Sequence, residues 1–292
     1  MKNQAIRSRL RSMQSIRKFR SNRGSLYRLI PNMVTLAALC AGLTAMRFAL
    51  ENQFTTAFLA VVLAAVLDGL DGRIARMIGA TSKFGAELDS LSDFVSFGVA
   101  PAFILYLWIL PVNEASTSNW SIFTVRLSWA VALIYSAAMA LRLARFNATL
   151  DDHDSPAWMK RYFVGVPAPM GSALAFLPMI YQTVYPDLSL RHPLVIDIWL
   201  LIVAGLMVSR IPTFSAKRIS LSNRWVVPIL MAVMVIVAGL ATAPWLTFAV
   251  VGTLYFASIP LTWWLAIGSQ KAAVEETQTP MAEVDKTIDP RF

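Results

Sequence analysis

The sequence predicts an all-helical polytopic membrane protein with about eight transmembrane helices. Hydrophobic residues make up 57% of the 292 residues and charged residues only 15%, a balance that soluble globular domains do not have. The hydrophobic residues occur in long runs, each able to cross a hydrocarbon core of about 30 Å at about 1.5 Å per helical residue. The basic residues are unevenly divided between the loops, as in membrane proteins of fixed orientation.

Eight hydrophobic runs, taken in order along the chain, define the predicted spans. The second and third carry a group of aspartates, and the first six are predicted to form a core around a polar cavity that faces the cytoplasm. The last two are separated only near Pro244 and are predicted to pack outside this core. The runs cover residues 29–50, 53–78, 86–112, 124–145, 164–184, 193–211, 225–243 and 244–267.

The distribution of Lys and Arg predicts the orientation. With the N-terminus in the cytoplasm and eight alternating spans, only Arg47, Arg126 and Arg191 of the 26 basic residues fall on the outer side. This pattern predicts cytoplasmic termini and places the aspartates described below at the cytoplasmic face. The expected location is the inner membrane of a bacterium. The net charge of +9 suits membrane lipids with anionic headgroups or a phosphorylated substrate. Nucleic acid is excluded as a partner, because the basic residues flank membrane spans.

Four segments follow from these patterns. Residues 1–28 lack acidic residues and repeat hydrophobic residues every three or four positions, which indicates an amphipathic helix on the membrane surface. A basic tail that only sets the topology is an equal alternative, and a cleaved transit peptide is a third. Residues 29–218 form the predicted catalytic core and residues 219–267 two additional helices. Residues 268–292 are polar, have no hydrophobic period and are predicted to be disordered.

Four carboxylates are the most informative feature of the chain, because a charge in an apolar segment is costly unless it is paired or holds a metal. Asp68 and Asp71 are three residues apart, and Asp89 and Asp93 are four apart, so each pair lies on one face of its helix. Antiparallel contact between the two helices would bring all four together. Such hard oxygen ligands predict Mg²⁺ or Mn²⁺, and their charge would balance two ions.

The spacing alone leaves two alternatives to a metal site. The carboxylates can form buried ion pairs with Arg73, Arg76 or Lys83, or they can mark an ion-transport pathway.

The neighbours of the aspartates suit a phosphate-containing ligand. Gly72 and Ala75 lie on the same helical face as the aspartates, and small side chains let a ligand approach the backbone closely. Arg76 can bind a phosphate through two parallel hydrogen bonds. Gly85 is predicted at the turn between the two helices.

The complete pattern, DGLDGRIAR at residues 68–76 and GAELDSLSD at residues 85–93, resembles the signature of the CDP-alcohol phosphatidyltransferase family. The resemblance implies an integral membrane enzyme that moves a phosphatidyl group from CDP-diacylglycerol to an alcohol, and it implies a homodimer. In the family the fourth aspartate is taken as the general base. Here that residue is Asp93, which would also be a metal ligand.

Three further segments resemble the phosphatidylserine synthases of this family and imply L-serine as the acceptor. They are FGAELDSLSDFVSFGVAPA at residues 84–102, RLARFN at residues 142–147 and SRIPTFSAKR at residues 209–218. Arg142, Arg145 and Asn147 are predicted to bind the carboxylate and the amino group of serine. The alternative is that these arginines bind anionic headgroups or set the topology.

The remaining candidates would bind the donor. Asn32 and Thr35, in the segment PNMVT, can contact the cytidine of CDP-diacylglycerol; the alternative is an ordinary helix N-terminus. The other residues predicted to bind this donor are Gly72, Ala75, Arg76 and Gly85. A second group of residues can bind the donor phosphate or lipid, and a loop that only sets the orientation is an equal alternative. These residues are Ser209, Arg210, Lys217 and Arg218.

Two rival functions stay open. Within the family the acceptor can be glycerol 3-phosphate, inositol phosphate or choline, and a dianionic acceptor would need additional basic groups. A cation-coupled secondary transporter is the alternative from another class, and it would show discontinuous helices or paired repeats.

Overall fold

The computed structural model describes residues 29–110, 119–150, 163–188, 190–209, 212–213 and 223–262. Within these residues the regular structure is helical apart from one antiparallel pair of two-residue strands. The predicted segments 1–28 and 268–292, together with Arg210, Lys217 and Arg218, lie outside them. The elements are α2 (Ile30–Leu50), α3 (Phe54–Met77), α4 (Lys83–Asp93), the π-helix η1 (Phe94–Val99), α5 (Ala100–Ile109), α6 (Asn119–Leu150), β1 (Phe163–Val164), α7 (Ala168–Ala175), α8 (Leu177–Val184), α9 (Pro193–Val208), β2 (Pro212–Thr213), α10 (Asn223–Thr242) and a last helix, Pro244–Thr262.

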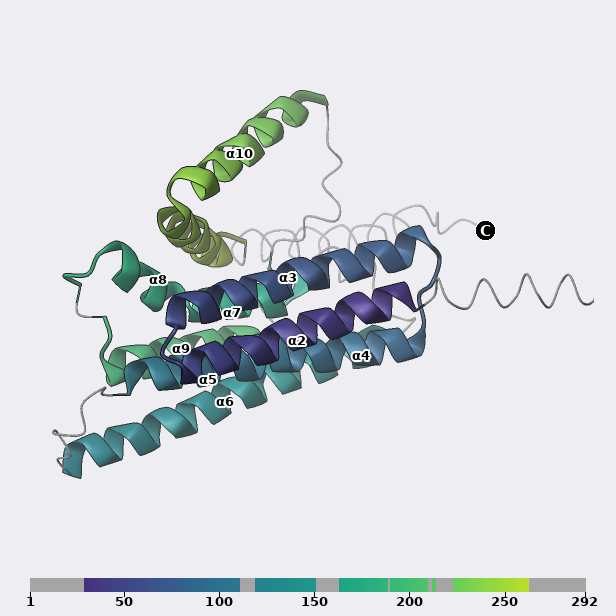
Figure 1. The fold of residues 1–292 in the computed structure, drawn as a ribbon. Coiled ribbons are helices and arrows are strands. Elements are labelled where there is room, and N and C mark those ends of the chain that lie inside the picture. Colours follow the sequence, from purple (N-terminus) through teal and green to yellow (C-terminus); the bar gives the residue numbers. More distant parts are fainter. Residues whose placement is uncertain are drawn as a thin grey trace, which may run out of the picture.

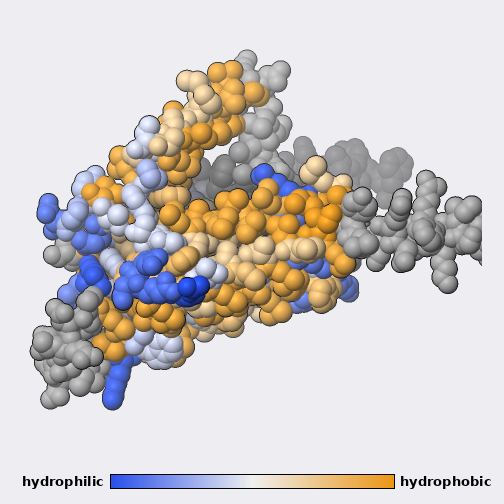
Figure 2. All heavy atoms as spheres, viewed as in Figure 1, coloured by the Kyte–Doolittle hydropathy of each residue, from blue (hydrophilic) through white to orange (hydrophobic). Residues whose placement is uncertain are grey.

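The prediction of an all-helical protein with membrane-spanning helices is confirmed. Five helices in the described part of the chain are long and apolar enough to cross a membrane: Ile30–Leu50, Phe54–Met77, Lys83–Ile109, Phe123–Ala148 and Pro244–Thr262. The apolar helices Pro193–Val208 and Val226–Thr242 are shorter, so eight spans remain a prediction. Figure 2 shows a mainly hydrophobic surface along the bundle, with hydrophilic residues gathered toward its ends, and a lipid environment would cover such a surface.

The fifth predicted span, residues 164–184, is two short helices rather than one. The break falls at Phe176, and Pro178 lies in the first turn of α8, where a missing N–H costs no helical hydrogen bond. The indole of Trp199 on α9 donates to the carbonyl of Leu174 at the end of α7, at 2.7 Å. The mean hydropathy of the run did not reveal the break, because the prolines and phenylalanine that surround it are apolar.

α2 lies alongside α3 and against the long helix formed by α4, η1 and α5 (Figure 1). Its buried positions recur every three or four residues and are small, which lets neighbouring backbones approach closely. At Gly42 an added Cβ would lie 2.5 Å from the hydroxyl of Ser96 in η1, so this contact requires glycine. The buried residues of α2 are Pro31, Thr35, Ala38, Gly42, Ala45 and Ala49. This packing fixes α2 against both helices that carry the aspartates.

The last helix packs on the other side of α3. The ring of Phe58 lies 5.4 Å from the ring of Trp245 and 5.2 Å from that of Phe248, measured between centroids. The hydroxyls of Tyr181 on α8 and Thr253 are 2.7 Å apart. α10 leans away from the bundle (Figure 1).

Candidate active site

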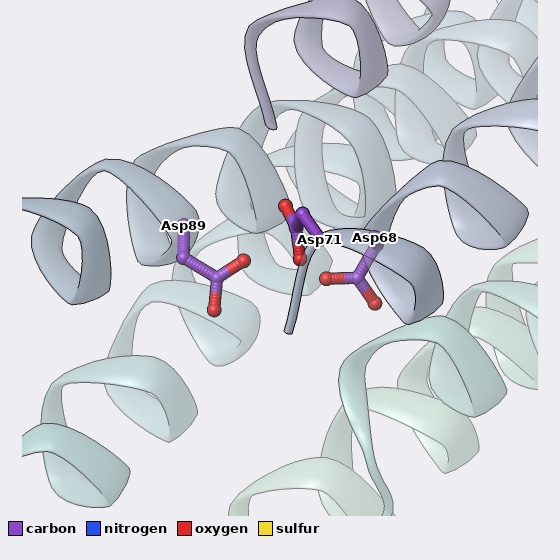
Figure 3. Close-up of side chains that lie close together, drawn as sticks. All are labelled: Asp68, Asp71 and Asp89. Carbon is purple, nitrogen blue, oxygen red and sulfur yellow. The ribbon is translucent and has the colours of Figure 1, made fainter. Parts of the chain in front are cut away.

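Three of the four predicted aspartates meet where α3 ends and α4 begins. Asp68, Asp71 and Asp89 each offer a carboxylate oxygen within 4.8 Å of the others, and Figure 3 shows the side chains converging from the two helices. Asp71 is only 5% exposed, and the other two are half-buried. Carboxylates this close repel one another without a cation between them, so the oxygen-only set suits Mg²⁺ or Mn²⁺.

A tight connection places the two helices. Gly79 has a φ of +62°, a conformation that favours glycine, and α4 then starts at the cap residue Ser82. The hydroxyl of Ser82 accepts a hydrogen bond from the backbone N–H of Gly85 at 3.0 Å. The prediction that Gly85 forms the turn is therefore wrong: it lies in the first turn of α4. An added Cβ there would lie 3.1 Å from Oδ1 of Asn32, so Gly85 lets α2 approach closely.

Buried ion pairing does not explain the aspartates. The ion pair recorded in the described part of the chain joins Arg47 and Glu51, near the other end of α2. The predicted alternative partners, Arg73, Arg76 and Lys83, are exposed and form no such pair with the aspartates. Among the described residues, no basic side chain forms an ion pair with the three carboxylates.

Asp93 lies beside this cluster, with its side chain next to that of Asp68. It lies one helical turn beyond Asp89 and is not among the three carboxylates that converge within 4.8 Å. It interacts electrostatically with Asp68 and Asp89, and also with the guanidinium of Arg142 on α6. The convergence of four carboxylates on one point is therefore found for three, and a ligand role for Asp93 stays a prediction.

Thr35 supports the cluster directly. Its hydroxyl lies 2.5 Å from Oδ2 of Asp71 and 3.0 Å from the carbonyl of Pro31, and the residue is buried. Because its hydroxyl is already paired with Asp71, the structure gives Thr35 a part in orienting that carboxylate. The sequence offered no signal for this contact, which joins residues 36 positions apart. A nucleotide contact by Asn32 or Thr35 remains a prediction.

The side of α3 next to Asp71 is open. An added Cβ at Gly72 would meet no atom of the described residues within 4 Å, while Ala75 is half-buried and Arg76 is exposed in the last turn. This space agrees with the expected approach of a ligand to the helix backbone. Contacts of these residues with CDP-diacylglycerol stay predictions.

The predicted acceptor residues all lie near the end of α6. The Nε of Arg142 donates to the carbonyl of Val166, and Nη2 of Arg145 donates to the carbonyl of Val208 at 2.6 Å. The amide of Asn147 donates to the hydroxyl of Ser90 on α4 at 3.0 Å. The end of α6 is thus tied to the residue next to Asp89. Ser90 was not predicted as a site residue, although its place beside Asp89 was a possible signal.

Two other residues need separate mention. The hydroxyl of Ser209 donates to the carbonyl of Leu206 at 2.7 Å, a local contact at the end of α9, so its predicted phosphate contact is untested. The hydroxyl of Tyr255, on the last helix, is buried and has no hydrogen-bond partner among the described residues. Tyr255 interacts electrostatically with Arg142, which sequence patterns could not have shown.

Comparison with known families agrees with this geometry. A family model described as CDP-alcohol phosphatidyltransferase matches residues 28–206, more than half of the chain. The chain belongs to the CDP-alcohol phosphatidyltransferase family. A second model, CDP-alcohol phosphatidyltransferase 2, matches residues 224–260, which the sequence analysis had placed outside the shared core. The predicted family resemblance is confirmed, and with it the expectation of a phosphatidyl-transferring membrane enzyme.

Several named proteins from other organisms are similar to this chain. A relative from Mycobacterium leprae is 36% identical over 241 residues, which cover 82% of this chain and 76% of the relative. One from Helicobacter pylori is 33% identical over 191 residues, covering 65% and 74%. One from Methanocaldococcus jannaschii is 38% identical over 145 residues, covering 50% and 57%. Each is named CDP-diacylglycerol–serine O-phosphatidyltransferase.

The contact between Thr35 and Asp71 makes a testable prediction. Thr35→Val keeps the shape of the side chain but removes the hydroxyl, and we expect it to weaken Mn²⁺ binding by about 10–100-fold, as is typical for partners that orient metal ligands. Thr44→Val is the control, because the hydroxyl of Thr44 on the same helix bonds only to the Cys40 carbonyl. Titrating Mn²⁺ by electron paramagnetic resonance measures both. Equal affinities in the two variants would contradict the orienting role.

Proposed function

We propose that this enzyme transfers the phosphatidyl group of CDP-diacylglycerol to the hydroxyl of L-serine, giving phosphatidylserine and CMP. The observation that carries the proposal is the convergence of Asp68, Asp71 and Asp89, which form no ion pair with a basic side chain of the described residues, beside Gly72 of α3. A pyrophosphate-containing donor and its metal ions fit that arrangement. The similarity to proteins named CDP-diacylglycerol–serine O-phosphatidyltransferase supports serine as the acceptor.

The positions of the carboxylates suggest a role for each aspartate. Asp68, Asp71 and Asp89 would hold Mg²⁺ or Mn²⁺, with Asp93 completing a site for two ions. Bound divalent ions would offset the charge that develops on the phosphorus and the leaving CMP. Asp93 would accept the proton of the serine hydroxyl. The serine oxygen then forms a bond to the diacylglycerol-bearing phosphorus, the pyrophosphate P–O bond breaks, and its electron pair leaves with CMP.

The acceptor pocket is proposed at the end of α6. Arg142 and Arg145 each use one nitrogen for a backbone carbonyl, and a guanidinium has five N–H groups, so both keep donors for a carboxylate. Arg142 also interacts electrostatically with Asp93, the proposed base. Asn147 would give up its hydrogen bond with Ser90, and its amide oxygen would accept a hydrogen bond from the serine ammonium.

Charge favours serine over the rival acceptors. The cations of α6 match the single carboxylate of serine, whereas they would repel the quaternary ammonium of choline. Glycerol 3-phosphate and inositol phosphate carry a dianionic phosphate and would need additional basic groups. The transporter alternative loses its main support, because the aspartates lie on α3 and α4 and not at the broken segment between α7 and α8.

We further propose that the site opens to the cytoplasm of a bacterial cell at the inner membrane, and that the protein is a homodimer. The basic residues Arg73 and Arg76 lie near the end of α3 and Lys83 begins α4, in keeping with the positive-inside rule. The dimer rests on the family alone.

Purified protein assayed with CDP-diacylglycerol and labelled serine tests the acceptor. We expect phosphatidylserine to form with Mg²⁺ or Mn²⁺ and no product from glycerol 3-phosphate, inositol phosphate or choline under the same conditions. If product forms from one of these alcohols but not from serine, serine is not the acceptor and the enzyme uses that alcohol instead.

Arg145→Ala tests the pocket. We expect the serine KM to rise by roughly 10–150-fold while the CDP-diacylglycerol KM stays nearly constant, because a charge-assisted hydrogen bond to a carboxylate is worth about 1.5–3 kcal/mol. Arg145→Lys should restore affinity only in part, since an ammonium lacks the planar fork. Arg126→Ala, on the distant part of the same helix, is the control. An unchanged serine KM in Arg145→Ala, with altered dependence on lipid, would make Arg145 a headgroup anchor.

A further inference from the structure

The helix that carries Asp89 and Asp93 changes its hydrogen-bond pattern directly after Asp93. Residues Phe94–Val99 form the π-helix η1, and the N–H of Ala100 donates to the carbonyl of Val95, five residues earlier. Such turns are rare and often occur at functional sites. Accommodating one extra residue rotates everything before it by about 100° relative to the rest of the helix. The direction in which the two aspartates point therefore depends on η1.

Pro101 is the reason why the π turn needs a hydrogen-bond donor from another helix. Pro101 has no N–H, so the carbonyl of Phe97, four residues earlier, lacks its usual donor. The hydroxyl of Tyr135 on α6 donates to this carbonyl at 3.1 Å. Tyr135 is fully buried, so water cannot take its place, and a buried carbonyl without a donor is strongly disfavoured.

The π turn is also held from both neighbouring helices. From η1, the hydroxyl of Ser96 donates to the carbonyl of Ala38 on α2 at 3.3 Å. An added Cβ at Gly98 would lie 2.9 Å from Cγ of Met139, which shows how closely α6 approaches. Among these contacts, the Tyr135 hydroxyl is the one that donates to the Phe97 carbonyl in place of the N–H that Pro101 lacks.

We propose that Tyr135 is a positioning residue: its hydroxyl holds the π turn and thereby directs Asp89 and Asp93 toward Asp68. The metal consequence of this inference rests on the proposed function, whereas the position of the helix does not. Arg142 lies seven residues after Tyr135 and so on the same face of α6. One helix face thus fixes the aspartate-bearing helix and places the guanidinium that interacts with Asp93.

Tyr135→Phe removes only the hydroxyl. We expect it to weaken Mn²⁺ binding at least about tenfold, the lower end of what loss of a supporting residue does to metal sites. Tyr181→Phe is the matched control. The hydroxyl of Tyr181 on α8 pairs with that of Thr253 on the last helix and not with the helix that carries Asp89 and Asp93. Electron paramagnetic resonance of Mn²⁺ measures both without any turnover.

A second readout follows the helix itself. In a Cys40→Ala background, Leu91→Cys should react readily with a maleimide in detergent and Ser92→Cys slowly, since Leu91 is 62% exposed and Ser92 only 3%. Tyr135→Phe should reduce this contrast, because rotation of α4 exchanges exposed and buried positions. Pro101→Ala should do the same with Tyr135 intact: it gives Phe97 a backbone donor and allows an ordinary α-helix, in which alanine is the better residue.

The outcomes separate the two proposals. If the labelling contrast falls but even the unaltered protein binds no Mn²⁺, the metal assignment fails and the role of Tyr135 in setting the helix stands. Unchanged labelling in both Tyr135→Phe and Pro101→Ala would overturn the positioning role, whatever the metal affinity. Unchanged Mn²⁺ affinity despite altered labelling would overturn the link between the π turn and the aspartates.

Discussion

Asp71→Asn is expected to abolish phosphatidyl transfer. The substitution removes one negative charge and one metal-binding oxygen from a cluster whose members lie within 4.8 Å, and it also disturbs the partner of Thr35. We expect a loss of more than about 100-fold in rate, above the upper end of what losing a supporting residue costs a metal site. Mn²⁺ affinity measured on the same sample should fall in parallel.

Asp197→Asn is the matched control for this change. Asp197 is also buried and lies on α9, where it accepts a hydrogen bond from Ser128 at 2.8 Å, away from the cluster. An amide oxygen can still accept that bond, so activity should be retained. Protein treated with a chelator should lose activity and regain it with Mg²⁺ or Mn²⁺. Near-normal turnover by folded Asp71→Asn, or by metal-free protein, would refute the metal mechanism.

Asp93→Asn should give a different loss. As the proposed base, Asp93 acts on the serine hydroxyl and not on the donor, so the rate of transfer should fall by about 10²–10⁴-fold. Donor binding in the presence of metal should fall less than in Asp71→Asn, because Asp93 is not one of the three carboxylates that converge within 4.8 Å. Rate and donor affinity are measured separately, by single-turnover assay and by equilibrium binding of CDP-diacylglycerol.

Asp71→Asn is the reference for that comparison. If donor affinity falls as far in Asp93→Asn as in Asp71→Asn, Asp93 is mainly a metal ligand and the base must be sought elsewhere. If affinity is kept and the rate falls, the two aspartates have distinct parts in the reaction.

The aspartates could be predicted from the sequence because their spacing is a local property. Residues three or four apart share a helix face, and an apolar surrounding makes each carboxylate conspicuous. Gly85 was misplaced because a glycine between two helices ordinarily suggests a turn. The structure uses Gly79 for the turn instead and Gly85 for the close approach of Asn32. A local pattern cannot distinguish a glycine needed for conformation from one needed for contact.

Contacts between distant segments were beyond the sequence. The bond from Thr35 to Asp71 and the bond from Tyr135 to Phe97 join positions 36 and 38 apart, and no periodicity encodes them. The division of residues 164–184 into α7 and α8 was missed for another reason. Hydropathy averages over a run, so it measures whether a segment prefers lipid but not whether its backbone continues as one helix.

The open face of α3 determines how the proposed donor is supplied. Gly72 leaves space next to Asp71, while Leu70 and Met77 on the same helix are exposed and hydrophobic. A donor anchored by two acyl chains can then reach the carboxylates by lateral diffusion, with its chains still in the bilayer. Supply becomes a two-dimensional problem, in which the mole fraction of donor in the leaflet sets the rate. Diluting the donor with inert lipid should therefore slow the enzyme even when the total amount of donor in the sample is constant.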